Sequence, residues 1–395
     1  MIYADNAATT KTSAAAQRAM LDAMEQCWGN PSSLHSPGQR AAEALASARE
    51  AVAKAIGAQP REIYFTSGGS EADNQAIVSA AKLGARKGRK HLVTTAIEHH
   101  AVLHTMAQLE KEGFAVTYVP VDESGIVKVD GIAAALREDT ALVSVMYANN
   151  EIGTIQPVSE IGALCRDRGI PFHTDAVQAV GHLPIDVAEQ NIDMLSLSGH
   201  KFHGPRGVGA LYVRRGMPLL TLIHGGAQER GFRAGTENLP AIMGMAAALE
   251  ESCANMAKNA AYVSGLRDAL TDGLSVIPHA ALNGSRDKRL PGNVSFCFEG
   301  IEGESLLLLL DDKGVAASSG SACTSGSLDP SHVLLAIGRP HEVAHGSLRL
   351  TLDEENTMED VEHIAAAVVE VVGYLRNMSP VWKALQRGER NYVIQ

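Results

Sequence analysis

The chain has few cysteines, and none of them are spaced for a shared metal or redox site. Its 395 residues include five cysteines, an odd number, and no Cys-x-x-Cys pair. A disulfide framework or a zinc knuckle is therefore not expected. We expect small buried side chains at four positions, Cys27, Cys165, Cys253 and Cys297. The fifth, Cys323, lies in a different setting.

A long hydrophobic run and a surplus of positive charge are also missing. The apolar stretch 306–310 is far shorter than the roughly 20 residues that cross a bilayer. No basic segment followed by an apolar one marks a signal peptide near residue 1. The net charge of -11 argues against binding to nucleic acid or to an anionic membrane. We expect a cytoplasmic protein that binds neither.

Over the first 250 residues, alanine-rich helical stretches alternate with short apolar strands. Strands are predicted at 62–66, 91–95, 115–119, 141–147, 170–174, 194–198 and 209–213, and helices at 41–56, 68–83, 100–112 and 158–168. Such alternation predicts an α/β fold with a mainly parallel sheet and helices on its faces. Ligands of such sheets bind beyond the carboxyl ends of the strands.

The pattern changes after residue 250. One long helix is predicted at 250–272, followed by strands at 293–298 and 347–352 and helices at 304–311 and 358–375. This mixture predicts a smaller α+β domain with an antiparallel sheet, and the length of the chain suits two domains. We expect a large domain over residues 12–250. Residues 1–11 and 251–395 would form the small domain, which carries Cys323 and Arg349.

One lysine follows a predicted strand and stands in a glycine-rich turn. The sequence Ser198-Gly-His200-Lys201 ends the strand at 194–198. Among histidines and backbone donors, the amine of Lys201 could lose its proton and attack an aldehyde, as in proteins that hold pyridoxal phosphate (PLP). An ordinary loop lysine is the alternative, and this segment alone does not decide between them.

A second strand ends in Thr66-Ser-Gly-Gly69-Ser70-Glu71 and leads into a helix. Small residues at a helix N-terminus expose backbone N–H groups, and the helix dipole favours an anion. Gly69 and Ser70 would suit a phosphate group. The alternative is a helix cap with glycine spacers.

Three more strand ends carry polar residues. His99 could lie over a flat cofactor ring and move protons, and the amide of Asn150 could bind a carboxylate or a ring hydroxyl. A carboxylate at Asp175 is costly to bury without a partner, and a pyridinium N–H would be one. Gln178 could donate to the ring oxygen. A capping histidine and a polar turn are alternatives, but the set together predicts a PLP site.

The sequence His341-Glu-Val-Ala-His345 matches the helix signature of zinc peptidases. That signature needs a helix that holds both histidines on one face. Pro340 before it and Gly346 after it leave room for one or two turns, and no third ligand follows. We expect no resident metal here, and interpret the segment as a loop leading to Arg349.

The segment 317–327 is rich in serine, glycine and alanine and contains Cys323. Such a composition is poorly suited to burying a cysteine and well suited to carrying a mobile thiol. A nucleophilic cysteine needs access and a thiolate fraction. The alternative is an incidental loop cysteine.

Several motifs in order resemble one known family. They are 5–10, 29–33, 149–151, 173–178, 198–201, 233–238 and 318–327. With them, the chain resembles cysteine desulfurases of the NifS/IscS type, in the class-V aminotransferase group of fold-type I PLP enzymes. The undivided Cys323 segment resembles the long-loop group that serves iron–sulfur scaffolds. Within that group, the sequences 233–238 and 317–327 and the ending Ser379-Pro-Val-Trp382 look closer to NifS than to IscS.

The resemblance implies a role for each site residue. In this family Lys201 would bind PLP as a Schiff base, His99 would stack on the ring, and Cys323 would take sulfur from the substrate. The other cofactor contacts would come from Gly69, Ser70, Asn150, Asp175, Gln178, Ser198, His200 and Thr236. Thr236 would belong to the site of the partner subunit, which implies a homodimer. Asn150 and Arg349 would hold the substrate carboxylate. Ser70 replaces the usual threonine and keeps the hydroxyl, and Ala4 replaces a larger apolar residue.

The implied reaction converts L-cysteine to L-alanine and leaves a persulfide on Cys323. A scaffold protein for iron–sulfur clusters would accept the sulfur, as in nitrogen fixation if the NifS likeness holds. Cys323 would then contact iron transiently through its persulfide. An aminotransferase or a selenocysteine lyase of the same fold is the alternative. A non-catalytic subunit would be expected to lack Lys201 or Asp175.

Overall fold

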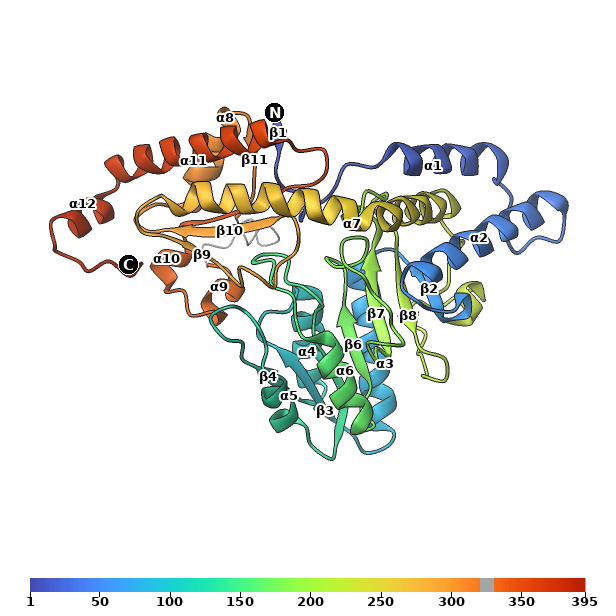
Figure 1. Ribbon diagram of the computed structural model, residues 1–395. Helices are drawn as coiled ribbons and strands as arrows, with labels where there is room; N and C mark the ends of the chain where they lie inside the picture. Colours follow the sequence, from blue (N-terminus) through green and yellow to red (C-terminus); the bar gives the residue numbers. More distant parts are fainter. Residues whose placement is uncertain (320–329, 395) are drawn as a thin grey trace.

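The computed structural model describes residues 1–319 and 330–394, so the expectation for Cys323 lies outside the described residues. Within them a seven-stranded sheet forms the centre of the larger part (Figure 1). Its strand order is β2-β8-β7-β6-β5-β3-β4. The strands are β2 (Ile63–Thr66), β3 (His91–Thr95), β4 (Ala115–Val119), β5 (Thr140–Ser144), β6 (Phe172–Asp175), β7 (Met194–Ser198) and β8 (Gly209–Val213).

The sheet is mainly parallel, as predicted. Only β8 runs against its two neighbours, β2 and β7. The central strands are buried along their whole length, which explains their continuous apolar sequences. The carboxyl ends of β6 and β7 lie side by side, with Asp175 paired to Ser196. The predicted site residues therefore leave the sheet at one edge.

Helices cover both faces of this sheet. One face packs against α3 (Gly69–Ala85) and α4 (His100–Lys111) through residues such as Ile77 and Met106. The other face packs against the remaining helices of this part, through residues such as Val52 and Ile161. These helices are α1 (Ala14–Gln26), α2 (Ser36–Ala55), α5 (Val129–Ala135), α6 (Val158–Asp167) and the first half of α7 (Leu239–Ser275). Short 3₁₀ turns occur at Pro60–Glu62, Gly199–Lys201 and Gln228–Gly231.

A smaller α+β part has its own core and lies at the upper left of Figure 1. Its antiparallel sheet has the order β12-β10-β9. The elements are β9 (Ala280–Leu282), β10 (Asn293–Phe298), α8 (Gly303–Asp312), α9 (His332–Ala336), α10 (His341–Ala344), β12 (Ser347–Thr351), α11 (Met358–Met378) and α12 (Pro380–Gln386). The first strand of the chain, β1 (Ile2–Tyr3), pairs in parallel with β11 (Val315–Ala316). The N-terminal segment thus belongs with this part.

The helix α7 (Leu239–Ser275) has 37 residues and joins the two parts. Its first half buries Ile242 and Met245 in the large core, and its second half buries Leu266 and Leu270 in the small core. Figure 1 shows it crossing above the sheet from one part to the other. The predicted domain boundary at residue 250 falls inside this helix, and both boundaries stay predictions.

No helix in the described part of the chain is both long and apolar enough to span a bilayer.

Candidate functional site

Ten of the twelve predicted site residues line one hollow of about 400 Å³ at the carboxyl ends of the strands. They are Gly69, Ser70, His99, Asn150, Asp175, Gln178, Ser198, His200, Lys201 and Arg349. The other two are not among its lining residues. Thr236 lies on the surface before α7, and Cys323 falls outside the described residues. The sheet edge and the small part meet at this hollow.

Lys201 enters the hollow from the turn after β7. Its Nζ donates hydrogen bonds to the carbonyl oxygens of Ala7 and Ala8, at 2.6 and 2.9 Å. These carbonyls belong to the N-terminal segment 5–10, which continues with Thr10 bonded to the carbonyl of His200. The amine is half-buried and points toward the N-terminal segment, where its position is fixed by two acceptors.

One end of the hollow, where a phosphate site was predicted, is formed where α3 begins. A Cβ on Gly69 would come within 2.5 Å of the Val177 side chain, so only glycine lets the helix start this close to the end of β6. Ser198 ends β7 and lines the same hollow. His200 lies nearby, and burial, together with Lys201 and Arg206, lowers its pKa to about 4. His200 is therefore neutral at neutral pH, and its Nδ1 lies 3.2 Å from the Thr9 hydroxyl.

Another part of the hollow is formed by His99 and Asp175, the residues predicted to contact a cofactor ring. His99 caps α4, and its Nδ1 accepts from the backbone N–H of Ala101 at 3.1 Å. Asp175 is 6% exposed, and its Oδ1 accepts from the Val177 N–H at 2.9 Å. Burial raises the pKa of Asp175, while His99, this backbone N–H and Lys201 lower it. A cation placed here would stabilise the ionised carboxylate.

Gln178 lines the hollow and contacts the N-terminal segment. Its Nε2 donates to the carbonyl oxygen of Ala7 at 3.0 Å. The same carbonyl accepts from Lys201, so the two side chains lie on one side of this segment. The predicted contact of Gln178 with a ring oxygen stays a prediction.

The opposite wall comes from the small part. Arg349 on β12 is buried, and its Nη2 forms an ion pair with Asp5 at 2.9 Å. Its Nη1 donates to the backbone oxygen of Asn150 at 3.1 Å. Its Nε is buried and has no hydrogen-bond partner among the described residues. An acceptor such as a carboxylate would satisfy that N–H.

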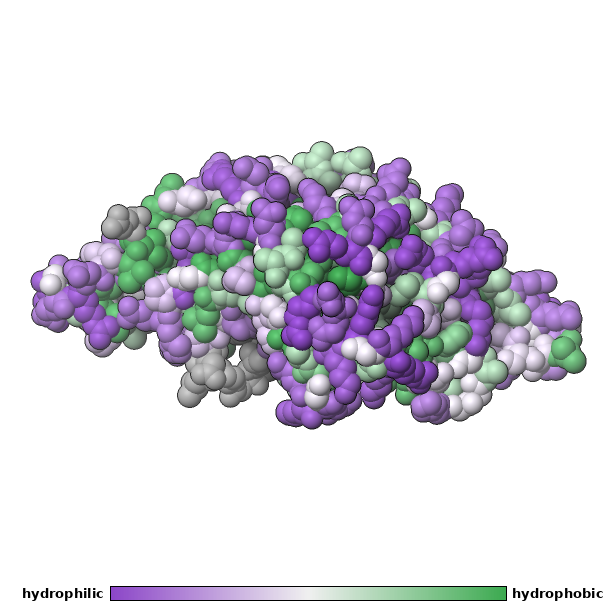
Figure 2. All heavy atoms as spheres, turned by 90° about the horizontal axis from the view of Figure 1, so that it is seen from below, coloured by the Kyte–Doolittle hydropathy of each residue, from purple (hydrophilic) through white to green (hydrophobic). Residues whose placement is uncertain are grey.

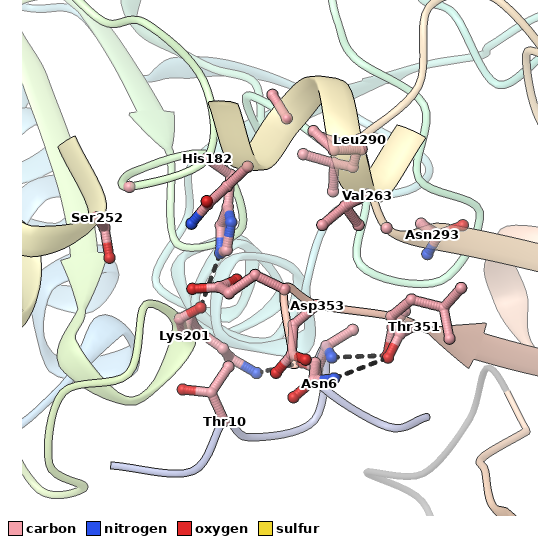
Figure 3. A pocket seen from close by; sticks show the side chains of 18 of the residues that line it. Asn6, Thr10, His182, Lys201, Ser252, Val263, Leu290, Asn293, Thr351 and Asp353 are labelled. Carbon is pink, nitrogen blue, oxygen red and sulfur yellow. Dashed lines mark hydrogen bonds between the residues drawn. The ribbon is translucent and has the colours of Figure 1, made fainter. Parts of the chain in front are cut away.

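A second hollow lies on the other side of Lys201, beneath α7 (Figure 3). Asn6, Thr10 and His182 point into it from the large part and the N-terminal segment, and Thr351 and Asp353 from the small part. His182 contacts the backbone oxygen of Lys201 at 2.8 Å through its Nε2. This hollow lacks His99, Ser70 and Asp175, so the larger set of predicted site residues lies in the first one.

Sequence reasoning missed two residues at the site. Asp5 was part of a family motif but had no role, and it forms the ion pair with Arg349. Asp73 of α3 lines the hollow and is 1% exposed. A signal for Asp73 was present, because it stands between Ala72 and Ala76 on the apolar side of a helix.

The zinc-peptidase signature folds as the short helix α10, which has four residues. The rings of His341 and His345 lie 4.6 Å apart. Among the described residues, the three-ligand cluster compact enough to hold a metal ion is Asp73, His99 and Asp175, inside the hollow. His341 and His345 are not part of it.

Comparison with known proteins identifies related families and sequences. The model of the aminotransferase class-V family matches residues 2–364. A cysteine desulfurase IscS of Clostridium botulinum (strain Hall) is 54% identical over 385 residues, which cover 97% of each chain. The cysteine desulfurase NifS of Azotobacter vinelandii is 49% identical over 383 residues, covering 96% of this chain and 95% of that protein.

Solved structures agree with the fold. A NifS-like protein superposes with a TM-score of 0.89 at 38% identity, covering 95% of this chain and 100% of that one. A structure described as SspA in complex with cysteine gives a TM-score of 0.78 at 37% identity, covering 89% and 99%. The IscS relative shares more identities with the chain than the NifS relative, so the predicted NifS-like subgroup stays a prediction. With the family match over most of its length, the chain belongs to the class-V aminotransferases and, among them, to the cysteine desulfurases.

Proposed function

We propose that this protein uses PLP to take sulfur from L-cysteine, giving L-alanine and a persulfide on Cys323. The observation that carries this proposal is the single hollow that joins Lys201, Asp175 and His99 to Arg349. The first three residues suit the cofactor, and the arginine suits the carboxylate of an amino acid. The high identity to cysteine desulfurases supports cysteine as that amino acid.

The residues of the hollow fit PLP in chemistry. The helix start at Gly69 with Ser70, Ser198 and His200 would hold the phosphate. Asp175 would hold the pyridine nitrogen in its protonated form, and His99 would lie against the ring. Bound PLP supplies an electron sink for the electrons of the substrate Cα–H bond. Lys201 would hold the cofactor and, with His99, move the proton of that bond.

Arg349 and Asn150 would orient the substrate. The buried Arg349 Nε has no partner among the described residues and would donate to the carboxylate of L-cysteine. Asp5 and the backbone of Asn150 hold the guanidinium in place before substrate arrives. This arrangement favours an α-amino acid over a simple amine.

The thiol of Cys323 would complete the reaction. Its thiolate attacks the substrate sulfur, the bond between that sulfur and the substrate carbon breaks, and an S–S bond forms. The carbon gains a proton and leaves as alanine, so one sulfur atom passes from substrate to enzyme with no external oxidant. A scaffold protein for iron–sulfur clusters is the proposed acceptor of this sulfur, with nitrogen fixation as the NifS-like case. The persulfide would be the transient contact with iron, and the cytoplasm the proposed location.

A homodimer is part of the proposal, because Thr236 would reach the phosphate of the partner's site. In one chain Thr236 lies on the surface and outside the hollow. Large apolar side chains are exposed on the arm formed by α1 and the turn to α2, among them Trp28 and Leu34 at 68% and 92%. Figure 2 shows hydrophobic atoms at the tip of this arm, at the right of the view. Apolar surface of this kind suits a subunit interface.

The test is to measure alanine and protein-bound sulfur after adding L-cysteine. Changing Cys323→Ser should abolish persulfide and lower alanine formation by more than about a hundredfold, while the cofactor absorbance stays. Cys253→Ser is the matched control, because Cys253 is a partly buried cysteine of α7 outside the hollow. Normal desulfurase turnover in the Cys323 variant, or amino transfer that depends on an α-keto acid, would contradict the proposal.

A further inference from the structure

A second carboxyl group lies beside Asp175 inside the hollow. Asp73 comes from the first turns of α3, just after the predicted phosphate ligands Gly69 and Ser70. Its carboxyl oxygen, one of Asp175 and a ring nitrogen of His99 all lie within 4.8 Å of one another. Asp73 has no assigned role in the proposed reaction, and its burial at this point is costly without one.

Beneath the two carboxyl groups, a layer of polar side chains crosses three neighbouring strands. His173 on β6 lies between two serine hydroxyls, with Nδ1 at 2.8 Å from Ser144 of β5 and Nε2 at 3.0 Å from Ser196 of β7. The same Nε2 is 3.6 Å from Oδ1 of Asp73. None of these three side chains on the strands is exposed. Asp73 therefore lies against a layer of buried polar side chains formed by Ser144, His173 and Ser196.

The protonation states of His173 and Asp73 follow from their burial. Burial lowers the pKa of His173 to about 3, so the imidazole is neutral at neutral pH and gives Asp73 no full positive charge. Burial and then the charge of Asp175 raise the pKa of Asp73 well above its usual range, although a hydrogen bond from Ser196 lowers it. Two carboxylates this close in a buried site do not both ionise readily.

The two carboxyl groups differ in their partners. Asp175 accepts from a backbone N–H and lies near Lys201 and His99, which favour its charged form. A ring nitrogen of His99 lies within 4.8 Å of both carboxyl groups, but Oδ1 of Asp73 accepts no hydrogen bond from the described residues, whereas Oδ1 of Asp175 accepts the Val177 N–H. When the two carboxyl groups together carry one proton, Asp73 is the protonated group and Asp175 is ionised.

We propose that Asp73 is a positioning residue for the cofactor: its protonated carboxyl, resting on His173, supports Asp175 and leaves Asp175 as the charged partner of the pyridine nitrogen. This inference rests on the proposed PLP site and adds a residue to it. It predicts that the form of Asp73 that matters is neutral, so an amide of the same shape should replace it and a smaller side chain should not.

The first test needs no cofactor. Infrared spectra of the apoprotein, labelled with ¹³C at the aspartate carboxyls, should contain a band of a protonated carboxylic acid at neutral pH. That band should vanish in Asp73→Asn. The matched control is Asp193→Asn, a buried aspartate just before β7 that pairs with Arg214 at 2.6 Å. A band that persists in Asp73→Asn would overturn the proposal, and so would its absence from the unmodified protein.

The second test uses the holoenzyme and the absorbance of the lysine-bound cofactor as a function of pH. Asp73→Asn should leave the pKa of that absorbance change within about 0.3 units, since one neutral group replaces another. If Asp73 were charged, removing its charge would destabilise the protonated cofactor–lysine group. The pKa would then fall by about one unit or more, and such a fall would refute the proposal.

The third measurement addresses support for Asp175. Asp73→Ala should raise the dissociation constant of PLP by about tenfold, comparable to losing a group that orients a ligand side chain. Unchanged PLP affinity in Asp73→Ala would refute a positioning role. If the unmodified protein showed no lysine-bound cofactor at all, the proposed PLP site would fail. The infrared result would still decide the protonation state of Asp73.

Discussion

The two walls of the hollow are built in different ways. The cofactor wall comes from consecutive strand ends of one sheet, where Asp175 and Lys201 are held by neighbouring strands β6 and β7. The opposite wall depends on Arg349, whose position is fixed by Asp5 and by the backbone of Asn150. These three residues come from distant parts of the chain. The first wall is a property of the sheet, and the second exists when the two parts and the N-terminal segment come together.

This difference predicts separable defects. Damage to the cofactor wall should remove chemistry whatever the substrate concentration. Damage to the arginine wall should mainly raise the amount of substrate needed, because Arg349 would bind the carboxylate and not the reacting atoms. The following variants test that separation.

The largest effect is expected for Lys201→Ala. Without the amine there is no covalent attachment of PLP, so the absorbance of the lysine-bound cofactor should disappear and alanine formation should fall by more than about a thousandfold. Lys82→Ala, an exposed lysine of α3 with an ion pair at 3.7 Å to Glu112, is the control. A lysine-bound cofactor band that survives in Lys201→Ala would exclude this residue as the attachment point.

A smaller and different effect is expected for Arg349→Lys. The single nitrogen of an ammonium group cannot replace the three separate nitrogens that Arg349 would direct at Asp5, Asn150 and a carboxylate, so KM for L-cysteine should rise about tenfold with a smaller change in kcat. The control is Arg376→Lys, a buried arginine of the small part that donates to the carbonyls of Glu299 and Pro278. Steady-state rates measured over a range of L-cysteine concentrations separate the two constants. A fall in kcat without a rise in KM would contradict the prediction that the two walls have separable effects.

The smallest effect concerns stability and involves Glu98, next to His99 in the cofactor wall. Glu98 is fully buried, and burial raises its pKa to about 8 from 4.5. The folded chain therefore keeps this proton up to about pH 8, while the unfolded chain releases it near 4.5. The stabilising contribution is full below pH 4.5 and is lost as the pH rises through about 8.

The glutamine in Glu98→Gln has the shape of the protonated acid and carries no titratable proton. The variant should therefore lose less folding stability than the unmodified chain as the pH rises. Its Oε1 can still accept from the Thr95 hydroxyl and the Met146 N–H, as Glu98 does at 2.6 and 3.0 Å. The quantity to compare is the Tm of the apoprotein variant minus the Tm of the unmodified apoprotein. We expect this difference to be about 3 °C or more larger at pH 8 than at pH 5. Calorimetry across this pH range measures the difference, with the exposed Glu43→Gln as control. An equal slope in both chains would show that Glu98 does not hold the proton.

Much of the fold could be predicted because the buried strands have clear sequences. The predicted bounds of β3, β4, β7, β8 and β10 match the structure. β5 was predicted to reach Tyr147 but ends at Ser144, and the N–H of Met146 bonds to the Glu98 side chain. No local pattern announces a hydrogen bond to a side chain 48 positions away.

Helix ends were harder to predict than helices. The helix predicted from residue 41 begins at Ser36, because His35 caps it and Pro37 suits its first turn. The helix α1 was not predicted, although Ser13 caps it and its sequence is alanine-rich. The helix predicted to be final, at 358–375, ends at Met378 and is followed by α12 after Ser379, which caps the new helix.

The sequence allowed the individual residues that line the hollow to be predicted. It did not allow the residues that contact them from distant parts of the chain to be predicted. Motif positions such as Asp175 and Lys201 follow strands and carry reactive groups, so their gathering was foreseeable. Asp73 lies beside Asp175 and Asp5 pairs with Arg349, although they are 102 and 344 positions apart in the chain. Such partners become visible when distances between side chains are known.

The pairing of the N-terminal segment with the end of the chain has a consequence for synthesis. Ile2 pairs with Val315, Asp5 with Arg349, and Ala7 donates to the Thr351 hydroxyl. Residues 2–7 must therefore wait for partners that lie more than 300 positions later in the chain. A ribosome-bound chain can complete the seven-stranded sheet long before it can close the hollow. The hollow can close only after Arg349 and Thr351 have been added, so sulfur chemistry cannot begin before that part of the chain is made.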